Sequence, residues 1–306
     1  MASNTNQPMA ARASVRAYAL LTMTALMWGC NAVFARLAVG EVSPMALVSL
    51  RWLGALLLLL VFAQQHVRRE WSVLRQNLVF LSIMGAFGFS IFNALFYVAA
   101  HSTTAVNIGI IQGSVPVFVL IGALLVYRTP VSVAQMAGVL ATIAGVTIVA
   151  SSGDLGRLAA LAINHGDILM VTASLLYAGY TVGLRRRPEV GSLALFTVMA
   201  SAAFLVSLPL VILEMALGAF QPPTATGWLL VGLIAFMPSF LAQVFYIKGV
   251  DLIGPGRAGI FFNLIPVFAS ILAVVLLDEA FEIYHVIALA LVLGGIWLAE
   301  SGKNIS

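Results

Sequence analysis

Charged residues are scarce in this chain of 306 residues: they make up 8% of the sequence, whereas hydrophobic residues make up 62%. A soluble globular domain contains about 25% charged residues, so this chain cannot build a water-soluble surface. The net charge of +4 does not indicate a nucleic-acid-binding protein, because the basic residues are confined to short segments between apolar runs. The composition therefore predicts a protein embedded in a membrane.

Cysteine and histidine are also rare. The single cysteine, Cys30, excludes an intramolecular disulfide and a thiolate metal cluster. The four histidines, His66, His101, His165 and His285, are scattered over predicted loops and helix ends, and neither HExxH nor GxSxG occurs. A membrane-embedded enzyme would need a nucleophile with a base, or a set of metal ligands, within the bilayer. We therefore expect no enzyme activity, no cofactor and no metal site.

The apolar runs lack the alternation of polar and apolar residues that a membrane β-barrel requires. Most of the ten runs have the length of about 17–25 residues that a helix needs to cross a bilayer. They span residues 17–38, 43–63, 77–100, 105–126, 132–150, 167–184, 193–213, 227–250, 258–277 and 283–299. The predicted fold is an all-α polytopic membrane protein with ten transmembrane helices, the first of them an uncleaved helix.

Lysine and arginine are distributed unequally between the two sides of such a bundle. If the N-terminus is cytoplasmic, two basic residues, Arg36 and Arg157, face outward. The inner side then carries Arg12, Arg16, Arg68, Arg69, Arg75, Arg128, Arg185, Arg186, Arg187, Lys248, Arg257 and Lys303. Cytoplasmic loops of membrane proteins are enriched in these residues. We therefore expect a multi-pass protein of the inner (plasma) membrane with both termini in the cytoplasm.

The two halves of the chain resemble each other. An offset of 149 residues aligns Ser90 with Ser239, and an offset of 150 aligns 116–118 with 266–268, both Pro-Val-Phe. Because each half has five predicted helices, the second half must cross in the opposite sense. This is an inverted repeat, the symmetry that alternating access requires. The predicted parts are a disordered cytoplasmic N-terminus (1–16), a first repeat (17–150), an outer linker (151–166), a second repeat (167–300) and a cytoplasmic tail (301–306).

Pro116 and Pro266 interrupt apolar segments at matching positions of the two halves. A proline removes one backbone donor and frees the carbonyl four residues earlier, here those of Gln112 and Phe262. In hydrocarbon a freed carbonyl costs several kcal/mol unless protein or cavity water satisfies it. Two matched interruptions indicate the binding site of a transporter. We expect both prolines to act as hinges.

Polar and aromatic side chains recur on single faces of the predicted helices, as Ser90, Asn93 and Tyr97 do at spacings of three and seven. Because polar groups in hydrocarbon are costly, we expect them to face a cavity. The alternative is that they join helices through hydrogen bonds worth about 0.6 kcal/mol each. The predicted substrate-binding residues are Trp28, Asn31, Ser90, Asn93, Tyr97, Gln112, Tyr177, Tyr180, Ser239, Gln243, Tyr246 and Asn263.

No carboxylate is predicted at the membrane midplane. Asp154, Asp167, Glu214, Asp278, Glu279 and Glu282 are assigned to the outer side. This argues against an antiporter of cationic drugs. Arg51 is the one charge well inside a span, and we expect it to snorkel to the outer headgroups, with binding of a carboxylate or a structural role as the alternative.

These features resemble the drug/metabolite transporter superfamily, EamA type: ten helices as two repeats, Trp28-Gly29 in the first helix, and central prolines in the fourth and ninth. The resemblance implies a central cavity, with helices five and ten at the periphery. It also implies export of small metabolites, most simply neutral or aromatic amino acids as in the bacterial amino-acid exporter branch. The alternatives are a nucleotide-sugar or other metabolite or drug carrier and, in other classes, a membrane-embedded enzyme or a scaffold. The expected partners are a small-molecule substrate and the lipid bilayer, without nucleic acid, and the sequence leaves open whether the protein is a monomer.

Overall fold

The computed structural model describes residues 6–128, 131–154, 164–253 and 258–301. All regular secondary structure in these ranges is helical. Eight helices are long and apolar enough to cross a membrane, and two shorter apolar helices span Phe261–Leu277 and Ile283–Ala299. The prediction of an all-helical polytopic membrane protein is confirmed.

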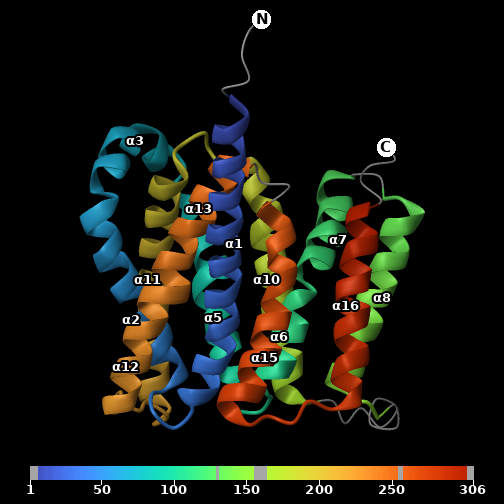
Figure 1. Cartoon of the computed structure of the whole chain (residues 1–306). Coiled ribbons are helices and arrows are strands. Elements are labelled where there is room, and N and C mark those ends of the chain that lie inside the picture. Colours follow the sequence, from blue (N-terminus) through green and yellow to red (C-terminus); the bar gives the residue numbers. More distant parts are fainter. Residues whose placement is uncertain (1–5, 129–130, 155–163, 254–257, 302–306) are drawn as a thin grey trace, which may run out of the picture.

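Figure 1 shows the helices as one upright bundle. Before residue 151 the chain forms α1 (Asn6–Leu37), α2 (Pro44–Phe62), α3 (Gln64–Gln76), α4 (Leu78–Gly85), η1 (Ala86–Ile91), α5 (Phe92–Ala99), α6 (Ala105–Gly113), α7 (Val115–Tyr127) and α8 (Val133–Ala150). After residue 164 it forms α10 (His165–Gly183), η2 (Leu184–Arg186), α11 (Ser192–Ala216), α12 (Ala225–Ile234), η3 (Ala235–Leu241), α13 (Ala242–Ile253), η4 (Ile260–Leu264), α15 (Ile265–Leu277) and α16 (Ile283–Ser301). These two groups are called the first and second halves.

Two helical segments differ from the sequence prediction. α1 begins at Asn6, within the segment 1–16 that was expected to be disordered. Alanine and arginine are frequent in this segment, and both have high helix propensity. α3 occupies the connection between the second and third predicted spans. It is an amphipathic helix with Leu74 buried, and a search for long apolar runs misses a helix of this kind because most of its residues are polar.

The bundle has two ends of different character. The first, called the α3 end, carries α3, the first turns of α1 and the last turns of α16 (Figure 1). The second, called the Asp167 end, carries the connections from α1 to α2 and from α11 to α12, which hydrogen-bond to each other through the backbone of Glu41 and Thr224. Asp167 lies there in the first turn of α10.

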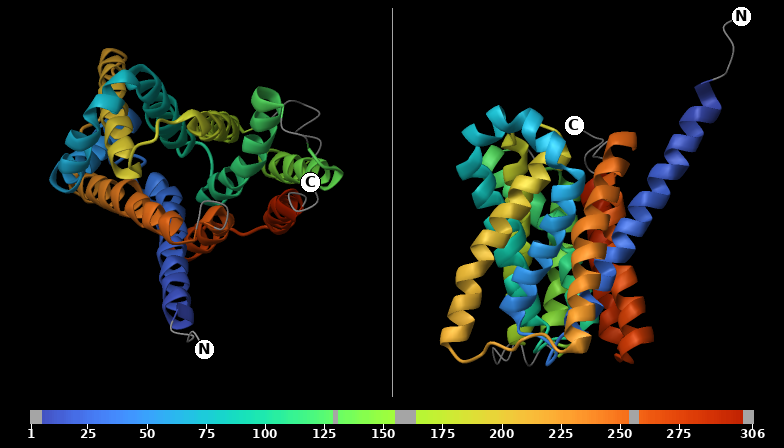
Figure 2. Two further views of the ribbon diagram at one scale, coloured as in Figure 1. Left: turned by 90° about the horizontal axis from the view of Figure 1, so that it is seen from above. Right: turned by 90° about the vertical axis from the view of Figure 1, so that its left-hand side faces the viewer.

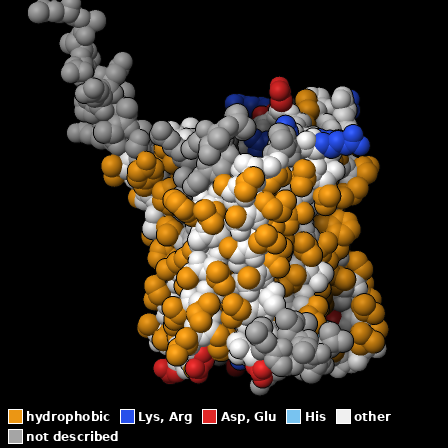
Figure 3. Space-filling view, turned by 90° about the vertical axis from the view of Figure 1, so that its right-hand side faces the viewer, with side chains coloured by type: hydrophobic (Ala, Val, Ile, Leu, Met, Phe, Trp, Pro, Cys, Tyr) orange, Lys and Arg blue, Asp and Glu red, His pale blue; other side chains and the backbone are white. Residues whose placement is uncertain are grey.

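The flank of the bundle is apolar. Figure 3 shows hydrophobic side chains over most of one side, with Lys and Arg gathered mainly at the α3 end and Asp and Glu mainly at the Asp167 end. Large apolar side chains such as Leu140 and Trp297 are exposed there, at 62% and 66%. A surface of this kind is stable in contact with lipid.

α8 and α16, the last helices of the two halves, lie side by side at one edge of the bundle (Figure 2). Their backbones touch because glycines face each other: a Cβ added to Gly138 would lie 2.3 Å from the carbonyl oxygen of Gly295. Small residues permit this close approach in membranes, where packing replaces the hydrophobic effect.

Four interruptions break the spans at matching positions of the halves. The π-helical turns η1 and η3 begin at Ala86 and Ala235, 149 residues apart. α7 and α15 each carry a proline in their first turn, Pro116 and Pro266. A proline is tolerated there because an N–H at that position has no partner within the helix. Each predicted hinge is therefore the start of a new helix, and its role in motion stays a prediction.

Candidate functional site

The two π-helical turns form the centre of the site, and side chains hydrogen-bond to backbone carbonyls in and beside these turns. Pro238 of η3 has no N–H for the carbonyl of Ile234, and the Ser239 hydroxyl donates to that oxygen instead, at 2.6 Å. The Trp28 indole N–H donates to the carbonyl of Pro238 at 3.1 Å. In η1 the Asn93 amide donates to the carbonyl of Phe89. π-helical turns recur at functional sites, and these bonds fix the positions of three predicted site residues.

Arg51 of α2 lies between the two π-helical turns and is only 4% exposed. Its Nε donates to Ser239 Oγ at 3.0 Å, and its Nη1 donates to Asn93 Oδ1 and Tyr97 Oη, both at 2.5 Å. Tyr97 donates in turn to Asn31 Oδ1 at 3.0 Å. The prediction that Arg51 snorkels to the outer headgroups is wrong, because its side chain is buried and donates to oxygen acceptors on neighbouring helices.

A cavity of about 70 Å³, called the deep cavity, lies beside Arg51. Its walls are largely aromatic: Trp52 stacks on Phe89 with ring centroids 4.8 Å apart, and Phe92 packs on Tyr177 at 5.1 Å. No aspartate or glutamate in the described part of the chain lines it. A small number of fixed polar groups in an aromatic enclosure is typical of small-molecule sites.

A larger cavity of about 330 Å³, called the vestibule, adjoins the deep cavity and shares Trp28, Tyr177 and Gln243 with it. At its rim lies Arg187, which is exposed. The segment after Arg187 is tied to α3, because the Gly191 N–H donates to Glu70 Oε2 at 2.8 Å. The vestibule therefore leads from the deep cavity towards the α3 end.

The structure brings most of the predicted site residues together. Those that line one or both cavities are Trp28, Asn31, Asn93, Gln112, Tyr177, Tyr180, Ser239, Gln243 and Tyr246. Ser90, Tyr97 and Asn263 do not line either cavity. Tyr97 lies behind Arg51, and the side-chain oxygens of Ser90 and Asn263 are buried without a hydrogen-bond partner among the described residues. Of the two prolines, Pro116 lines both cavities and Pro266 lines neither.

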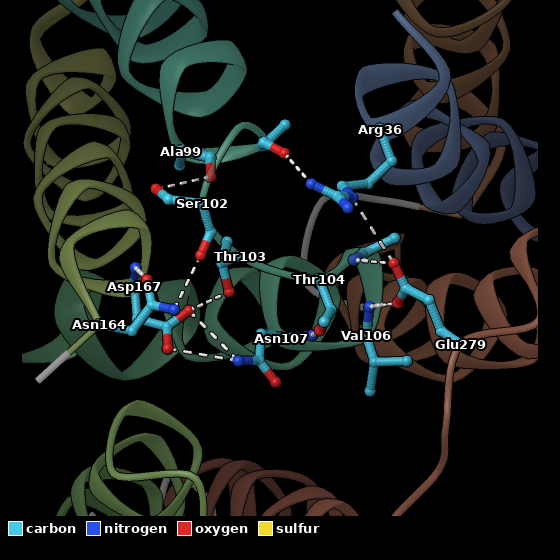
Figure 4. Close-up of polar contacts among 12 residues, drawn as sticks. Arg36, Ala99, Ser102, Thr103, Thr104, Val106, Asn107, Asn164, Asp167 and Glu279 are labelled. Carbon is cyan, nitrogen blue, oxygen red and sulfur yellow. Dashed lines mark hydrogen bonds and ion pairs between the residues drawn. The ribbon is translucent and has the colours of Figure 1, made fainter. Parts of the chain in front are cut away.

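A buried polar cluster joins helices at the Asp167 end (Figure 4). Asp167 is fully buried and accepts hydrogen bonds from the Thr103 hydroxyl and from Asn107 Nδ2, the latter at 3.3 and 3.2 Å. His285 Nε2 lies 3.1 Å from Asn107 Oδ1, and its Nδ1 accepts the Glu282 backbone N–H at 2.9 Å. Because Nδ1 is an acceptor, Nε2 carries the proton and donates to Asn107, so His285 is neutral.

Two further carboxylates at this end bind the N-termini of helices that lack an acidic residue in their own first turn. Glu279 accepts the Ala105 and Val106 N–H groups at 2.9 and 3.0 Å, and Arg36 lies 3.8 Å from it. Glu214 accepts the Ser43 hydroxyl at 2.6 Å and the N–H groups that open α2. A negative charge is favourable at a helix N-terminus. The sequence prediction located these acids on the outer side but did not predict their burial. The signal for it was that the first turns of α2 and α6 contain no acidic residue, so that an acid from elsewhere in the chain could bind there.

The apolar flank, the helical spans and the internal cavities define a multi-pass membrane protein whose interior can hold a small molecule. The chain belongs to the EamA-like transporter family, whose sequence profile matches residues 15–151 and again residues 164–300. The protein is therefore a membrane transporter and not an enzyme.

The relatives agree with this assignment. The chain is 26% identical to the uncharacterized transporter YyaM of Bacillus subtilis, over 92% of this chain and 93% of the relative. It is 24% identical to the uncharacterized inner membrane transporter YedA of Escherichia coli K12, over 92% of this chain and 89% of the relative. One solved crystal structure matches with a TM-score of 0.62 over 97% of this chain and 99% of that chain, and its 18% identity shows the fold alone.

Proposed function

We propose that the protein exports small metabolites across the plasma membrane by alternating access, with neutral or aromatic amino acids as the first candidate substrates. The observation that carries the proposal is the composition of the deep cavity. Both halves contribute to it: Asn31 and Gln112 come from the first half, and Ser239 and Gln243 from the second. Such a site at the interface of two repeats is accessible in turn from either side when the halves exchange conformations.

The matching interruptions support the proposed inverted repeat. The two π-helical turns and the two helix starts at Pro116 and Pro266 recur at the offsets that align the halves in sequence. The family profile also matches the chain twice. An odd number of spans in each half would give the halves opposite orientations.

The contrast between the two ends supports alternating access. The vestibule leads towards the α3 end, whereas buried hydrogen bonds close the Asp167 end. With the lysines and arginines on the cytoplasmic side, the α3 end is cytoplasmic and the protein is open to the cytoplasm. YedA is an inner membrane transporter, which is consistent with the proposed location.

A carrier of anionic metabolites, such as a nucleotide sugar, is the second candidate. Arg51 and Arg187 line the cavities, and no aspartate or glutamate of the described residues does. Two cations without an acidic partner in the lining favour an anionic ligand.

Flux in proteoliposomes tests the proposed function. The purified chain is reconstituted, and uptake of labelled neutral and aromatic amino acids and of labelled nucleotide sugars is measured in separate assays. We expect saturable amino-acid flux that Gln243→Leu reduces and that Leu140→Ala, on the lipid-facing flank, leaves unchanged. Saturable flux of nucleotide sugars alone would favour the second candidate, and the absence of saturable flux for every solute would contradict the proposal.

A further inference from the structure

Two hydrogen-bond donors of the deep cavity have no partner among the described residues. The hydrogen bonds of Arg51 use Nε and Nη1, which leaves Nη2 free. The indole N–H of Trp52, the next residue in the chain, is buried without a hydrogen-bond partner. Both residues line the deep cavity, and Arg51 Cζ lies 5.3 Å from the centroid of the Trp52 ring. Two neighbouring residues of the cavity lining therefore carry unused donors.

The charge of Arg51 is also uncompensated. Within the described ranges the ion pair that forms joins Arg36 and Glu279, so Arg51 has no carboxylate partner there. Its three hydrogen bonds go to neutral oxygens. A buried charge is costly to desolvate unless an opposite charge accompanies it. A negatively charged ligand in the deep cavity would therefore compensate the charge of Arg51.

The shape of the unused donors matches a carboxylate. A guanidinium presents its N–H groups in a planar fork that fits the two oxygens of a carboxylate, and hydrogen bonds between ionised groups are the stronger ones. The indole N–H adds a third donor. The deep cavity of about 70 Å³ has room for a carboxylate and a few further atoms, since one water needs about 10–15 Å³ on the same measure.

The surroundings indicate what the rest of the ligand is. Trp28 and Phe262, with ring centroids 5.0 Å apart, line both the deep cavity and the vestibule of about 330 Å³. Gln112 Oε1 is buried at the deep cavity without a partner and can accept a hydrogen bond from an ammonium or hydroxyl group. An apolar or aromatic body thus fits beyond the carboxylate.

We propose that Arg51 and Trp52 form a carboxylate subsite, and that the transported solute is a carboxylate with an apolar or aromatic body. A simple carboxylic acid and an amino acid share this chemistry. The transport part rests on the proposed function, whereas binding to the subsite does not.

A ligand series on the wild-type protein tests the subsite without depending on any variant. The full chain, purified in detergent, is titrated with 3-phenylpropanoate, phenylalanine, phenethylamine and 3-phenylpropanamide, and binding is followed by thermal shift. These probes share a phenyl ring and differ in the group at the end of the chain. We expect the two carboxylates to bind at least about tenfold more tightly than the amine and the amide, the size expected for a buried hydrogen bond to a charged group. Tighter binding of phenylalanine identifies an amino acid, and tighter binding of 3-phenylpropanoate identifies a simple acid.

Two conservative variants separate binding from a merely structural role. Arg51→Lys keeps the charge but removes the fork, and Trp52→Phe keeps the ring on Phe89 but removes the N–H. Both should reduce the preference for 3-phenylpropanoate over its amide, Arg51→Lys by about tenfold and Trp52→Phe by less. Lys248→Gln, which removes an exposed charge outside both cavities, should leave the preference unchanged.

Equal affinities of the wild-type protein for the carboxylate and the amide overturn the proposal, as does the absence of binding by both carboxylates at millimolar concentration. Full retention of the preference in both folded variants also overturns it. Flux in proteoliposomes is a separate measurement. Carboxylate binding without flux would contradict the proposed function and leave the subsite intact. Flux without a preference for carboxylates would support the proposed function and contradict the subsite.

Discussion

Tyr97 and Tyr246 occupy matching positions of the two halves, 149 residues apart, and their surroundings differ. Tyr97 is 2% exposed, accepts a hydrogen bond from Arg51 and donates one to Asn31. Tyr246 lines the vestibule and packs on Trp28 with ring centroids 5.6 Å apart. The same side chain is thus sealed between helices towards the Asp167 end and borders a cavity towards the α3 end. This is the asymmetry that the proposed mechanism requires of any single conformation.

Cysteine labelling measures this asymmetry directly and should give the largest effect. With Cys30 first replaced by alanine, Tyr246→Cys should react with a water-soluble thiol reagent on the order of tenfold faster than Tyr97→Cys, because access limits the reaction. Substrate should slow labelling of Tyr246→Cys. Glu189→Cys, exposed at the α3 end, is the control and should react at the same rate with and without substrate. Equal rates at the two tyrosine positions would show that the two ends do not differ.

Asp167→Asn should weaken the closed end. The new amide group would place a donor against the Asn107 amide, and a buried unsatisfied donor costs about 1–3 kcal/mol. We expect the melting temperature to fall by roughly 2–10 °C and labelling of Tyr97→Cys to increase. Glu189→Gln also removes one negative charge, but at an exposed site, and should change neither quantity. An unchanged melting temperature in Asp167→Asn would mean that the cluster does not stabilise this end.

Replacing the hinge prolines should slow the exchange between the two proposed conformations of the transporter and should not change the contacts at either end. Pro116→Ala and Pro266→Ala restore a backbone donor at the start of α7 and α15, which favours a continuous helix across the break. Initial transport rates should fall several-fold while expression stays near normal. Pro209→Ala, in an exposed position inside α11, is the matched control and should transport normally. Normal rates in both hinge variants would argue against a hinge.

The smallest effect is expected for the contact that ties α3 to α11. Glu70 accepts one exposed N–H group, that of Gly191, whereas Glu279 accepts two partly buried ones. Glu70→Gln should therefore lower the free energy of unfolding by less than about 0.5 kcal/mol, and Glu279→Gln by about 1–2 kcal/mol. Chemical denaturation in detergent compares the two. A larger loss for Glu70→Gln would mean that these contacts hold the α3 end more strongly than the Asp167 end.

The sequence predicted features that depend on periodicity. Length and hydropathy indicate the apolar helices. The expectation that polar residues within the spans face a cavity agrees with the places of Asn31, Gln112 and Gln243, whereas helical spacing alone misplaced Ser90 and Tyr97, which share a predicted face with Asn93 but do not line a cavity. The alignment of the two halves also predicts that the proline interruption recurs. It does not predict the π-helical turns, because a π-helical turn has no residue pattern of its own.

Features that depend on which helices meet could not be predicted. The direction of Arg51 follows from acceptors 42 to 188 residues away in the chain, and no local pattern records them. The same holds for Asp167, whose partner Asn107 is 60 residues away. A single sequence gives the face of a helix but not its neighbours, so hydrogen bonds between helices become known only with the packing.

The carboxylates that bind helix N-termini have a consequence for biosynthesis. Glu214 and Glu279 belong to the second half, yet the helices that they complete, α2 and α6, belong to the first. While the ribosome is still making the second half, the first half would be present in the membrane with two helix starts lacking their acids. Glu70 shows the opposite arrangement: it belongs to the first half and accepts the Gly191 N–H at the start of α11, in the second half. A gene cut near residue 151 should therefore yield two fragments that are unstable when made separately and stable when made together.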